Sequence, residues 1–184
     1  MSVWLVVLIL GGVGVVTLIL FFYATFGLMF VFGAPWVPTS PKVARAMLEL
    51  AGLKRNETLL DLGCGHGVIS ILAAKEIDAK GIGLDIHPGL VWWARWRALI
   101  RGVRHRTSFR RANLLKTTLP KVDVVSIYLL DGLMNELRDI LVRDLNPGTR
   151  IVSHGFAFKD IEPHRTVRLD KKQLYLYQVQ DLKR

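Results

Sequence analysis

The sequence predicts an α/β protein whose mainly parallel sheet ends in an antiparallel C-terminal hairpin, with one transmembrane helix ahead of it. Three observations lead to this fold class. The N-terminal segment is predominantly apolar on every helical face. Short β-branched runs then alternate with helical segments, and a polar turn separates the last two runs. The expected organisation is a transmembrane helix over 1–33, a proline-rich connector over 34–41 and an α/β domain over 42–184.

Charge and apolar residues are distributed unevenly along the 184 residues. The formal net charge is +10, 51% of the residues are hydrophobic and the mean hydropathy is +0.33. No charged residue or histidine precedes Lys42, so the whole net charge belongs to the rest of the chain. A domain this basic is attracted to nucleic acid or to the anionic cytoplasmic leaflet of a membrane. The single cysteine, Cys64, has no partner for an internal disulfide, which is consistent with a reducing compartment.

The N-terminal helix is expected to span a membrane once. Residues 3–32 are uninterrupted by charge, and about 20 apolar residues are enough to cross a bilayer core. A basic n-region is missing and the apolar part is too long, so the segment does not fit a signal peptide. Trp4 and Trp36 lie near its ends, where interfacial tryptophans are common. The basic residues beyond the helix place the following domain in the cytoplasm by the positive-inside rule; they are Lys42, Arg45, Lys54 and Arg55.

Three prolines in residues 34–41 prevent the membrane helix from continuing into the domain. Ser40 and Pro41 have the types expected at an N-cap and a first helical residue, so a helix is expected from there to about Ala51. The connector is either a stiff linker or a segment that brings Thr39 and Ser40 to the ligand of the domain.

The segment 57–75 predicts a ligand-binding corner. Thr58 to Leu62 has the length and composition of a buried strand, three glycines follow at alternate positions, and an apolar helix begins at Val68. Glycines let the backbone approach a ligand, and a helix N-terminus offers free N–H groups. The spacing is DxGxGxG rather than GxGxxG. The carboxylate of Asp61 at the strand end repels a pyrophosphate and suits a cationic amino group.

A second acidic residue follows the next strand. Lys80 to Leu84 is expected to be a strand that ends on Asp85, whose carboxylate is placed to accept hydrogen bonds from ribose hydroxyls. The alternative is a glycine-rich turn with an unrelated surface aspartate. Cys64 lies inside the glycine turn and is expected to fill space beside the ligand rather than to act as a nucleophile.

An aromatic and basic helix is expected over 88–101. Trp92, Trp93 and Trp96 alternate with Arg95, Arg97 and Arg101, and more arginines follow. Three interpretations stay open. The helix contacts a membrane interface, it contacts nucleic acid by stacking and phosphate pairing, or its tryptophans pack on the sheet and its arginines face solvent.

The rest of the chain completes the sheet. Strands are expected over 107–110, 122–128 and 149–154, with a helix over 133–145. A C-terminal hairpin of strands 165–169 and 174–179 gives the parallel sheet an antiparallel edge. The turn Ala112–Asn113 after the third strand is expected beside an adenine, where an amide and backbone N–H groups read the base, although Asn113 alternatively caps the turn.

These motifs resemble those of small membrane-anchored class I lysine methyltransferases that depend on S-adenosylmethionine (SAM). The family includes enzymes that act on the c-subunit of ATP synthase and on the adenine nucleotide translocase, with archaeal and bacterial homologues. The matching stretches are WVPTSPKVARAMLELAGL, LLDLGCGHGVISILAAK (motif I), GIGLDIHP, RRANLL, VDVVSIYLL and RIVSHGFAFKDIEPHRT. The resemblance implies a Rossmann-like class I fold, SAM as cofactor and a protein lysine as acceptor.

The resemblance also implies roles for individual residues. Asp61, Gly63 and Gly65 would hold the methionine part of SAM, Asp85 the ribose, Asn113 the adenine region, and Thr39 with Ser40 the amino-acid end. The other residues expected to bind the cofactor are Cys64, Ile86 and Ala112. Tyr128 would sit where the transferable methyl emerges. The chain departs from the family pattern at His66, where an acidic residue is usual, and at Ile161, where tryptophan is common.

The implied reaction needs little from the protein beyond position and an uncharged amine. A free lysine has a pKa of about 10.4 and is protonated at neutral pH, and a desolvating pocket lowers that value. Tyr128 is the candidate wall and hydrogen-bond partner of the amine. Asp131 either orients the amine or caps the following helix. His154 is expected to cap its strand rather than to accept a proton, and no residue cluster has metal-ligand spacing.

Other readings of the function remain. A phospholipid N-methyltransferase would find its amine in the bilayer that the chain enters. A nucleic-acid methyltransferase fits the arginines, but the residues after the fourth strand lack the proline pair of the (N/D)PP(Y/F) loop found in many enzymes that act on base amines. A SAM-binding protein without activity is disfavoured by the intact glycine turn and Asp85. The expected partners are therefore a membrane-associated protein, and the bilayer itself through residues 3–32 and the helix over 92–101.

Overall fold

The computed structural model describes residues 2–31, 37–129, 131–169 and 172–183. The chain forms two compact units, Met1–Val37 and Pro38–Arg184. The first unit holds helix α1 (Val3–Val31), and α1 is long and apolar enough, by length and composition alone, to cross a bilayer. Trp4 is exposed near its start, whereas Trp36, the tryptophan expected at the other interface, lies outside the described residues.

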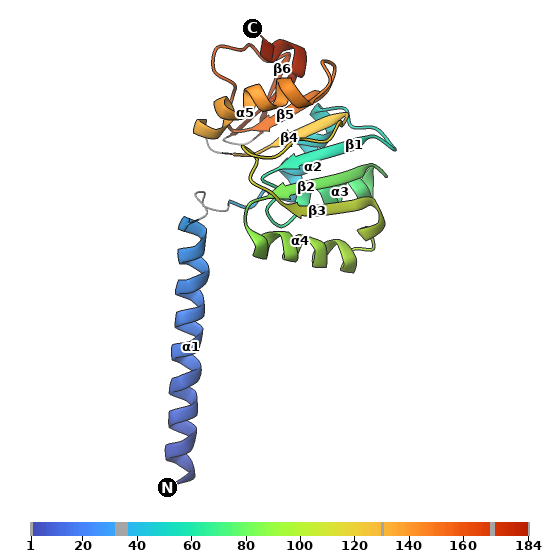
Figure 1. Ribbon diagram of the computed structural model, residues 1–184. Coiled ribbons are helices and arrows are strands. Elements are labelled where there is room, and N and C mark those ends of the chain that lie inside the picture. Colours follow the sequence, from blue (N-terminus) through green and yellow to red (C-terminus); the bar gives the residue numbers. More distant parts are fainter. Residues whose placement is uncertain (1, 32–36, 130, 170–171, 184) are drawn as a thin grey trace. The chain divides into compact units, whose positions relative to one another are not determined.

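The second unit is built on one seven-stranded sheet with the order β3-β2-β1-β4-β5-β7-β6 (Figure 1). Strands β1 to β5 run parallel to one another, while β7 is antiparallel to both β5 and β6. The bounds are β1 (Thr58–Leu62), β2 (Lys80–Asp85), β3 (Thr107–Arg111), β4 (Val124–Ile127), β5 (Arg150–His154), β6 (Arg165–Leu169) and β7 (Lys172–Gln178).

The C-terminal hairpin is confirmed at one edge of the sheet, where both of its pairings are antiparallel. The antiparallel strand β7 lies second from the edge, and the edge strand β6 runs in the same direction as the five parallel strands. The reason is topological: β7 inserts between β5 and β6, so the hairpin returns toward the sheet centre. Strand β7 therefore contributes side chains next to those that follow β4 and β5.

Helices cover both faces of the sheet, as expected for a Rossmann-like fold (Figure 1). They are α2 (Pro41–Leu50), α3 (Val68–Glu76), α4 (Pro88–Ile100) and α5 (Asp131–Asp144), with short 3-10 helices η1 (Arg104–Arg106) and η2 (Val179–Lys183). Helices α2, α3 and α4 pack on one face, and α5 and η2 pack on the other. Alternate residues of β1 separate the two cores: Leu59 packs with α2 and α3, whereas Leu60 and Leu62 pack with α5.

Local sequence explains where the helices begin. Ser40 caps α2 as predicted, because its hydroxyl accepts a hydrogen bond from the Val43 N–H at 3.3 Å. His87 caps α4 in the same way through Nδ1 and the Leu90 N–H, and a proline follows each cap. These caps fix where α2 and α4 start relative to the ends of the strands.

Helix α3 and strand β2 approach each other closely at Gly81. A Cβ added to Gly81 would lie 2.7 Å from the Ser70 carbonyl oxygen and 2.9 Å from the Ser70 Cβ. Only a glycine fits this approach, so the seat of α3 on the sheet depends on it.

Candidate active site

The glycine turn follows β1 and is tied to the carboxyl end of the neighbouring strand β2. The backbone N–H groups of Gly63 and Cys64 both donate to the Leu84 carbonyl, at 2.9 and 3.0 Å. Gly63, Gly65 and Gly67 all have positive φ, from +51° to +78°, a region that strains most other residues. The turn therefore bends sharply out of β1 and leads into the N-terminus of α3, where backbone N–H groups lack helical partners.

The turn also has no room for side chains at its first and last glycines. A Cβ on Gly63 would lie 2.5 Å from Leu129, and one on Gly67 would lie 2.8 Å from the Phe109 ring. The turn is thus shaped by packing from β3 and from the segment after β4.

Asp85 ties the turn to the end of β2. One carboxylate oxygen accepts from the Gly65 N–H and the other from the His87 N–H, both at 2.8 Å. The side chain is buried, which keeps it rigid. A carboxylate has about four acceptor positions, so two backbone donors leave acceptor capacity at the site where a ribose was expected.

Asp61 is the most perturbed acid of the site. It is 3% exposed and its Oδ1 accepts from the Ser126 hydroxyl at 2.8 Å, from the neighbouring position of β4. Burial raises the pKa of Asp61 to about 7, the Ser126 hydrogen bond opposes that rise, and the charge of Asp85 adds to it. No described lysine, arginine or histidine forms an ion pair with Asp61. A positively charged ligand group would supply the missing compensation.

Cys64 and His66 line the same turn without reactive chemistry. Burial raises the pKa of the Cys64 thiol well above its ordinary value, with further increases from the charges of Asp61 and Asp85. The thiol therefore stays protonated and is a poor nucleophile. His66 contributes its carbonyl, which accepts from Arg97 of α4 at 2.8 Å, and burial lowers the pKa of its ring to about 4.

The turn after β3 lies beside Asp85. The Ala112 N–H donates to the Asp85 carbonyl at 2.9 Å, and Arg111 Nε donates to the Ile86 carbonyl at 3.2 Å. The Asn113 side-chain oxygen accepts from the Leu115 N–H at 3.0 Å, which is the turn-capping alternative. The Asn113 amide nitrogen and the neighbouring backbone remain the groups available to an adenine, so that role stays a prediction.

Two other predicted contacts are left open. The Ser40 hydroxyl is engaged in capping α2, and Thr39 precedes it in a partly buried position, so their role at the amino-acid end of SAM stays a prediction. Asp131 is the first residue of α5 rather than the residue before it, and its side chain lies outside the described residues, so both roles expected for it stay predictions.

A pocket of about 400 Å³ opens beside Tyr128, after the end of β4. Its other lining residues come from the segment after β5 and from the hairpin; they are Gly155, Phe156, Arg168, Lys172, Gln173 and Tyr175. The Lys172 ammonium donates to the Tyr128 hydroxyl and lies 4.6 Å from the centre of its ring. The pocket therefore presents a phenol next to two cationic side chains.

His154 supports the back of Tyr128. The two ring centres are 4.1 Å apart, and His154 is buried with neither ring nitrogen in a hydrogen bond. The prediction that His154 caps its strand is therefore wrong. Burial, with a smaller effect of the Lys172 charge, lowers the pKa of His154 to about 4, so the ring is neutral at physiological pH.

Sequence reasoning missed Ser126, Lys172 and Arg168. Ser126 was detectable in principle, because a polar residue within the apolar run 122–128 indicates a specific partner. Lys172 and Arg168 carried no local signal. Lys172 of β7 reaches the pocket because β7 pairs with β5, and Arg168 of β6 reaches it because β6 pairs with β7.

Comparisons with known proteins agree with this geometry. A family model described as the ANTKMT methyltransferase domain matches residues 61–165, a range that contains the glycine turn, Asp85 and Tyr128. A protein-lysine N-methyltransferase from Saccharolobus islandicus is 34% identical over 148 residues, covering 78% of this chain and 92% of the relative. A lysine N-methyltransferase of the ATP synthase c-subunit from Xenopus laevis is 31% identical over 129 residues, covering 70% of this chain and 56% of the relative.

A solved structure is also similar. It is a crystal structure of an RNA methyltransferase from Salinibacter ruber in complex with S-adenosyl-L-homocysteine, with 40% identity and a TM-score of 0.76. The match covers 78% of this chain and 94% of that one. The chain thus spans nearly the full length of the Saccharolobus and Salinibacter proteins and a little over half of the Xenopus protein.

Proposed function

The chain belongs to the ANTKMT methyltransferase-domain family, and on that premise we propose that it methylates lysine side chains of proteins at a membrane. The chain is a class I SAM-dependent methyltransferase.

The proposed SAM site is the glycine turn with its two acids. SAM supplies an electrophilic methyl group on a positively charged sulfur. Asp61 lies where it would compensate a cationic amino group, and binding such a group favours its ionised form, because an opposite charge lowers the pKa of a buried acid. Asp85, held by the N–H groups of Gly65 and His87, would accept ribose hydroxyls. The adenine would lie by Ala112 and Asn113, with Ile86 beside the ribose.

The proposed acceptor site is the pocket beside Tyr128. A lysine nitrogen can attack a methyl group only when its lone pair is free. The charges of Lys172 and Arg168 at the pocket disfavour an ammonium ion there, because like charges lower the pKa of an amine. Lys172 also donates to the Tyr128 hydroxyl, so the phenol proton is directed away from Lys172 and toward another acceptor. The Tyr128 hydroxyl would thereby be oriented to meet the incoming amine.

His154 would position Tyr128 rather than transfer protons. Its pKa of about 4 makes it a weak base, and its ring lies against the Tyr128 ring. The two rings restrict the rotation of Tyr128 at the end of β4. Positioning of this kind is the main contribution that a protein makes to an in-line transfer.

Helix α1 is the proposed membrane anchor. Its length and composition suffice to span a bilayer, and basic residues follow it, which would place the methyltransferase unit in the cytoplasm. A membrane-held enzyme fits acceptors that are themselves in the membrane, such as the one named for the Xenopus relative.

The proposal rests on one observation: the similarity of this chain to the Saccharolobus protein-lysine N-methyltransferase covers 92% of that relative. The test is to incubate the full-length protein and methyl-labelled SAM with membranes, then to separate protein, lipid and RNA. Label in protein that amino-acid analysis identifies as methyl-lysine is the expected result. Label only in lipid or only in RNA would overturn the lysine acceptor while preserving the methyltransferase.

A pair of variants tests the proposed SAM site, both by calorimetry and in the transfer assay. Asp85→Ala should lose SAM binding by calorimetry and lose transfer, because the ribose contact and the support of the turn both disappear. The matched control is Glu162→Gln, an exposed acid outside the site, which should behave as wild type. Unchanged affinity in the Asp85 variant would show that the ribose lies elsewhere.

A further inference from the structure

Almost the whole net charge of the chain lies in one segment. Residues 86–121 contain nine of the 25 lysines and arginines and none of the 15 acidic residues, so they carry +9 of the formal +10. The segment comprises α4, η1, the edge strand β3 and the turn that follows it. The basic character of the chain is therefore a property of one region of the methyltransferase unit.

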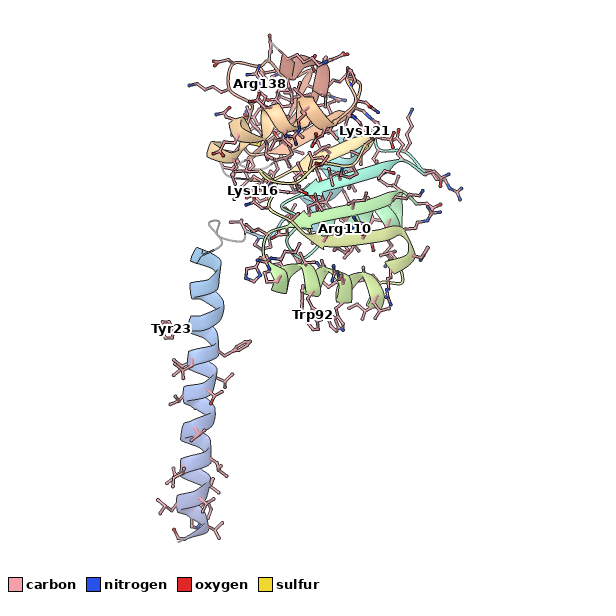
Figure 2. The ribbon with its side chains drawn as sticks, viewed as in Figure 1. Tyr23, Trp92, Arg110, Lys116, Lys121 and Arg138 are labelled. Carbon is pink, nitrogen blue, oxygen red and sulfur yellow. The ribbon has the colours of Figure 1, made fainter. Side chains whose placement is uncertain are left out.

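Helix α4 in this segment has a large apolar outer face. Its buried side is small, made by Val91, Ala94 and Ala98. The tryptophans do not pack on the sheet: Trp92, Trp93 and Trp96 are 63%, 44% and 42% exposed, and Figure 2 shows Trp92 pointing away from the sheet. Leu99 and Ile100 are also exposed. We call these five side chains the α4 outer face; their spacing of three and four places them on one side of the helix.

The arginines around this face divide into two groups. Arg95 donates to the Phe109 carbonyl, Arg97 to the His66 carbonyl, and Arg106 pairs with Asp78, so these three hold α4 and η1 in place. Arg101, Arg104 and Arg110 are exposed, and none of the described acidic residues pairs with them. Arg101 and Arg104 directly follow α4 in the chain and leave positive charge available at the end of the apolar face, whereas Arg110 follows Phe109, which packs against α4, and therefore points to the other face of the sheet.

We propose that the α4 outer face docks onto the surface of a bilayer that contains anionic lipids. Tryptophan rings have an apolar body and a polar N–H that suit the headgroup region, and arginine stems extend to lipid phosphates. The aliphatic side chains of the α4 outer face favour an anionic bilayer over a nucleic acid. Leu99 and Ile100 gain by entering an acyl boundary but have no partner on a polynucleotide, where recognition uses stacking and phosphate contacts.

This contact extends the membrane location proposed above but is separate from both α1 and methyl transfer. A helix that lies on the surface would restrict how the methyltransferase unit rotates on its connector. The edge of the sheet at β3 and α4 would then face the lipid, and the opposite edge, with β6 and β7, would be left for a protein acceptor.

Residue-resolved oxidation tests the proposal on the full chain. The protein is placed in nanodiscs of phosphatidylcholine alone or of phosphatidylcholine mixed with phosphatidylglycerol, exposed to hydroxyl radicals and analysed by mass spectrometry. Oxidation of Trp92, Trp93 and Trp96 should fall several-fold in the anionic discs. The protection should disappear in high salt, because the Debye length shrinks from about 10 Å at 0.1 M to about 3 Å at 1 M. Equal oxidation in both discs would overturn the proposal.

Two charge variants make the test specific. Arg101→Gln with Arg104→Gln should abolish the protection in anionic discs. Lys159→Gln with Arg165→Gln removes the same number of exposed charges elsewhere and should retain it. Protection by RNA added to the neutral discs, without an effect of anionic lipid, would assign the face to nucleic acid instead. Insertion of the protein into neutral discs tests whether α1 is a membrane anchor, and transfer of label from SAM tests the methyltransferase activity. A failure of the proposed function is therefore distinguished from a failure of the proposed α4 contact.

Discussion

At the scale of single residues, Asp61 makes the stability of the fold at the proposed SAM site depend on pH. Its folded pKa of about 7 exceeds the ordinary value of about 3.9, because the carboxyl is buried without a described cationic partner. Between these two values the unfolded state has lost a proton that the folded state keeps. The free energy of unfolding therefore falls as pH rises from about 4 to about 7, by roughly 1.4 kcal/mol for each pH unit.

Replacing Asp61 with Asn should remove this part of the pH dependence. In urea unfolding without SAM, the free energy of unfolding of the variant should be close to that of the wild type near pH 4. It should exceed the wild-type value increasingly as pH rises toward 7. The pKa values of His66 and His154 are lowered, so these two residues make the free energy of unfolding rise with pH in both proteins. The difference in free energy between the two proteins therefore reports on Asp61 alone. Parallel stability curves would show that Asp61 titrates normally.

Lys172 should set the pH dependence of turnover. Replacing it with Met removes a positive charge beside Tyr128, so the acceptor amine should return toward its ordinary pKa of about 10.4. The pH profile of kcat should move to higher pH, and for each pH unit that it moves, kcat at pH 7 should fall about tenfold. Lys183→Met, an exposed lysine of η2, is the matched control. An unchanged profile with a higher KM would indicate a role in acceptor binding alone.

At the scale of elements, Gly81 governs how α3 sits on β2. Gly81→Ala places a methyl 2.7 Å from the Ser70 carbonyl, and backbone on both sides limits relief. We expect a loss of about 1–3 kcal/mol in the free energy of unfolding. Gly132→Ala, in an exposed position of α5 with open space around it, should instead gain about 0.5–1 kcal/mol. Equal effects in the two variants would contradict the close approach.

The elements were mostly predictable because their signals are local. The spacing of the glycines after Asp61 and the strand-forming run before them correctly predicted β1, the turn and α3. The pair Ser40 and Pro41 correctly predicted the start of α2. Shifts of a residue or two at other ends have local causes. For example, β4 begins at Val124 rather than at residue 122, and the Asp123 carboxylate accepts from the Thr58 N–H at 2.8 Å.

The rest depended on contacts between distant parts of the chain. Tyr128 and Lys172 are 44 residues apart, and Asp61 and Ser126 are 65 apart, so no local pattern joins them. The direction of β6 follows from the insertion of β7, and the exposure of the α4 tryptophans follows from how small residues already fill its inner face.

At the scale of the whole molecule, the two compact units should respond separately to ligand and heat. In detergent, S-adenosyl-L-homocysteine at about 100 times its Kd should stabilise the methyltransferase unit by about 2.7 kcal/mol. For a unit of this size that is a rise of roughly 5–10 °C in Tm. Circular dichroism should show the helical signal of α1 persisting above that transition. Loss of all helical signal in one step would mean that α1 depends on the folded unit.

The insertion of β7 between β5 and β6 has a consequence for biosynthesis. The glycine turn, Asp61 and Asp85 are complete once β4 has left the ribosome, but Lys172 belongs to the last of the seven strands to emerge. A nascent chain therefore carries the residues of the proposed SAM site before those of the proposed acceptor pocket. Until β7 pairs with β5 and β6, the proposed pocket beside Tyr128 lacks Lys172.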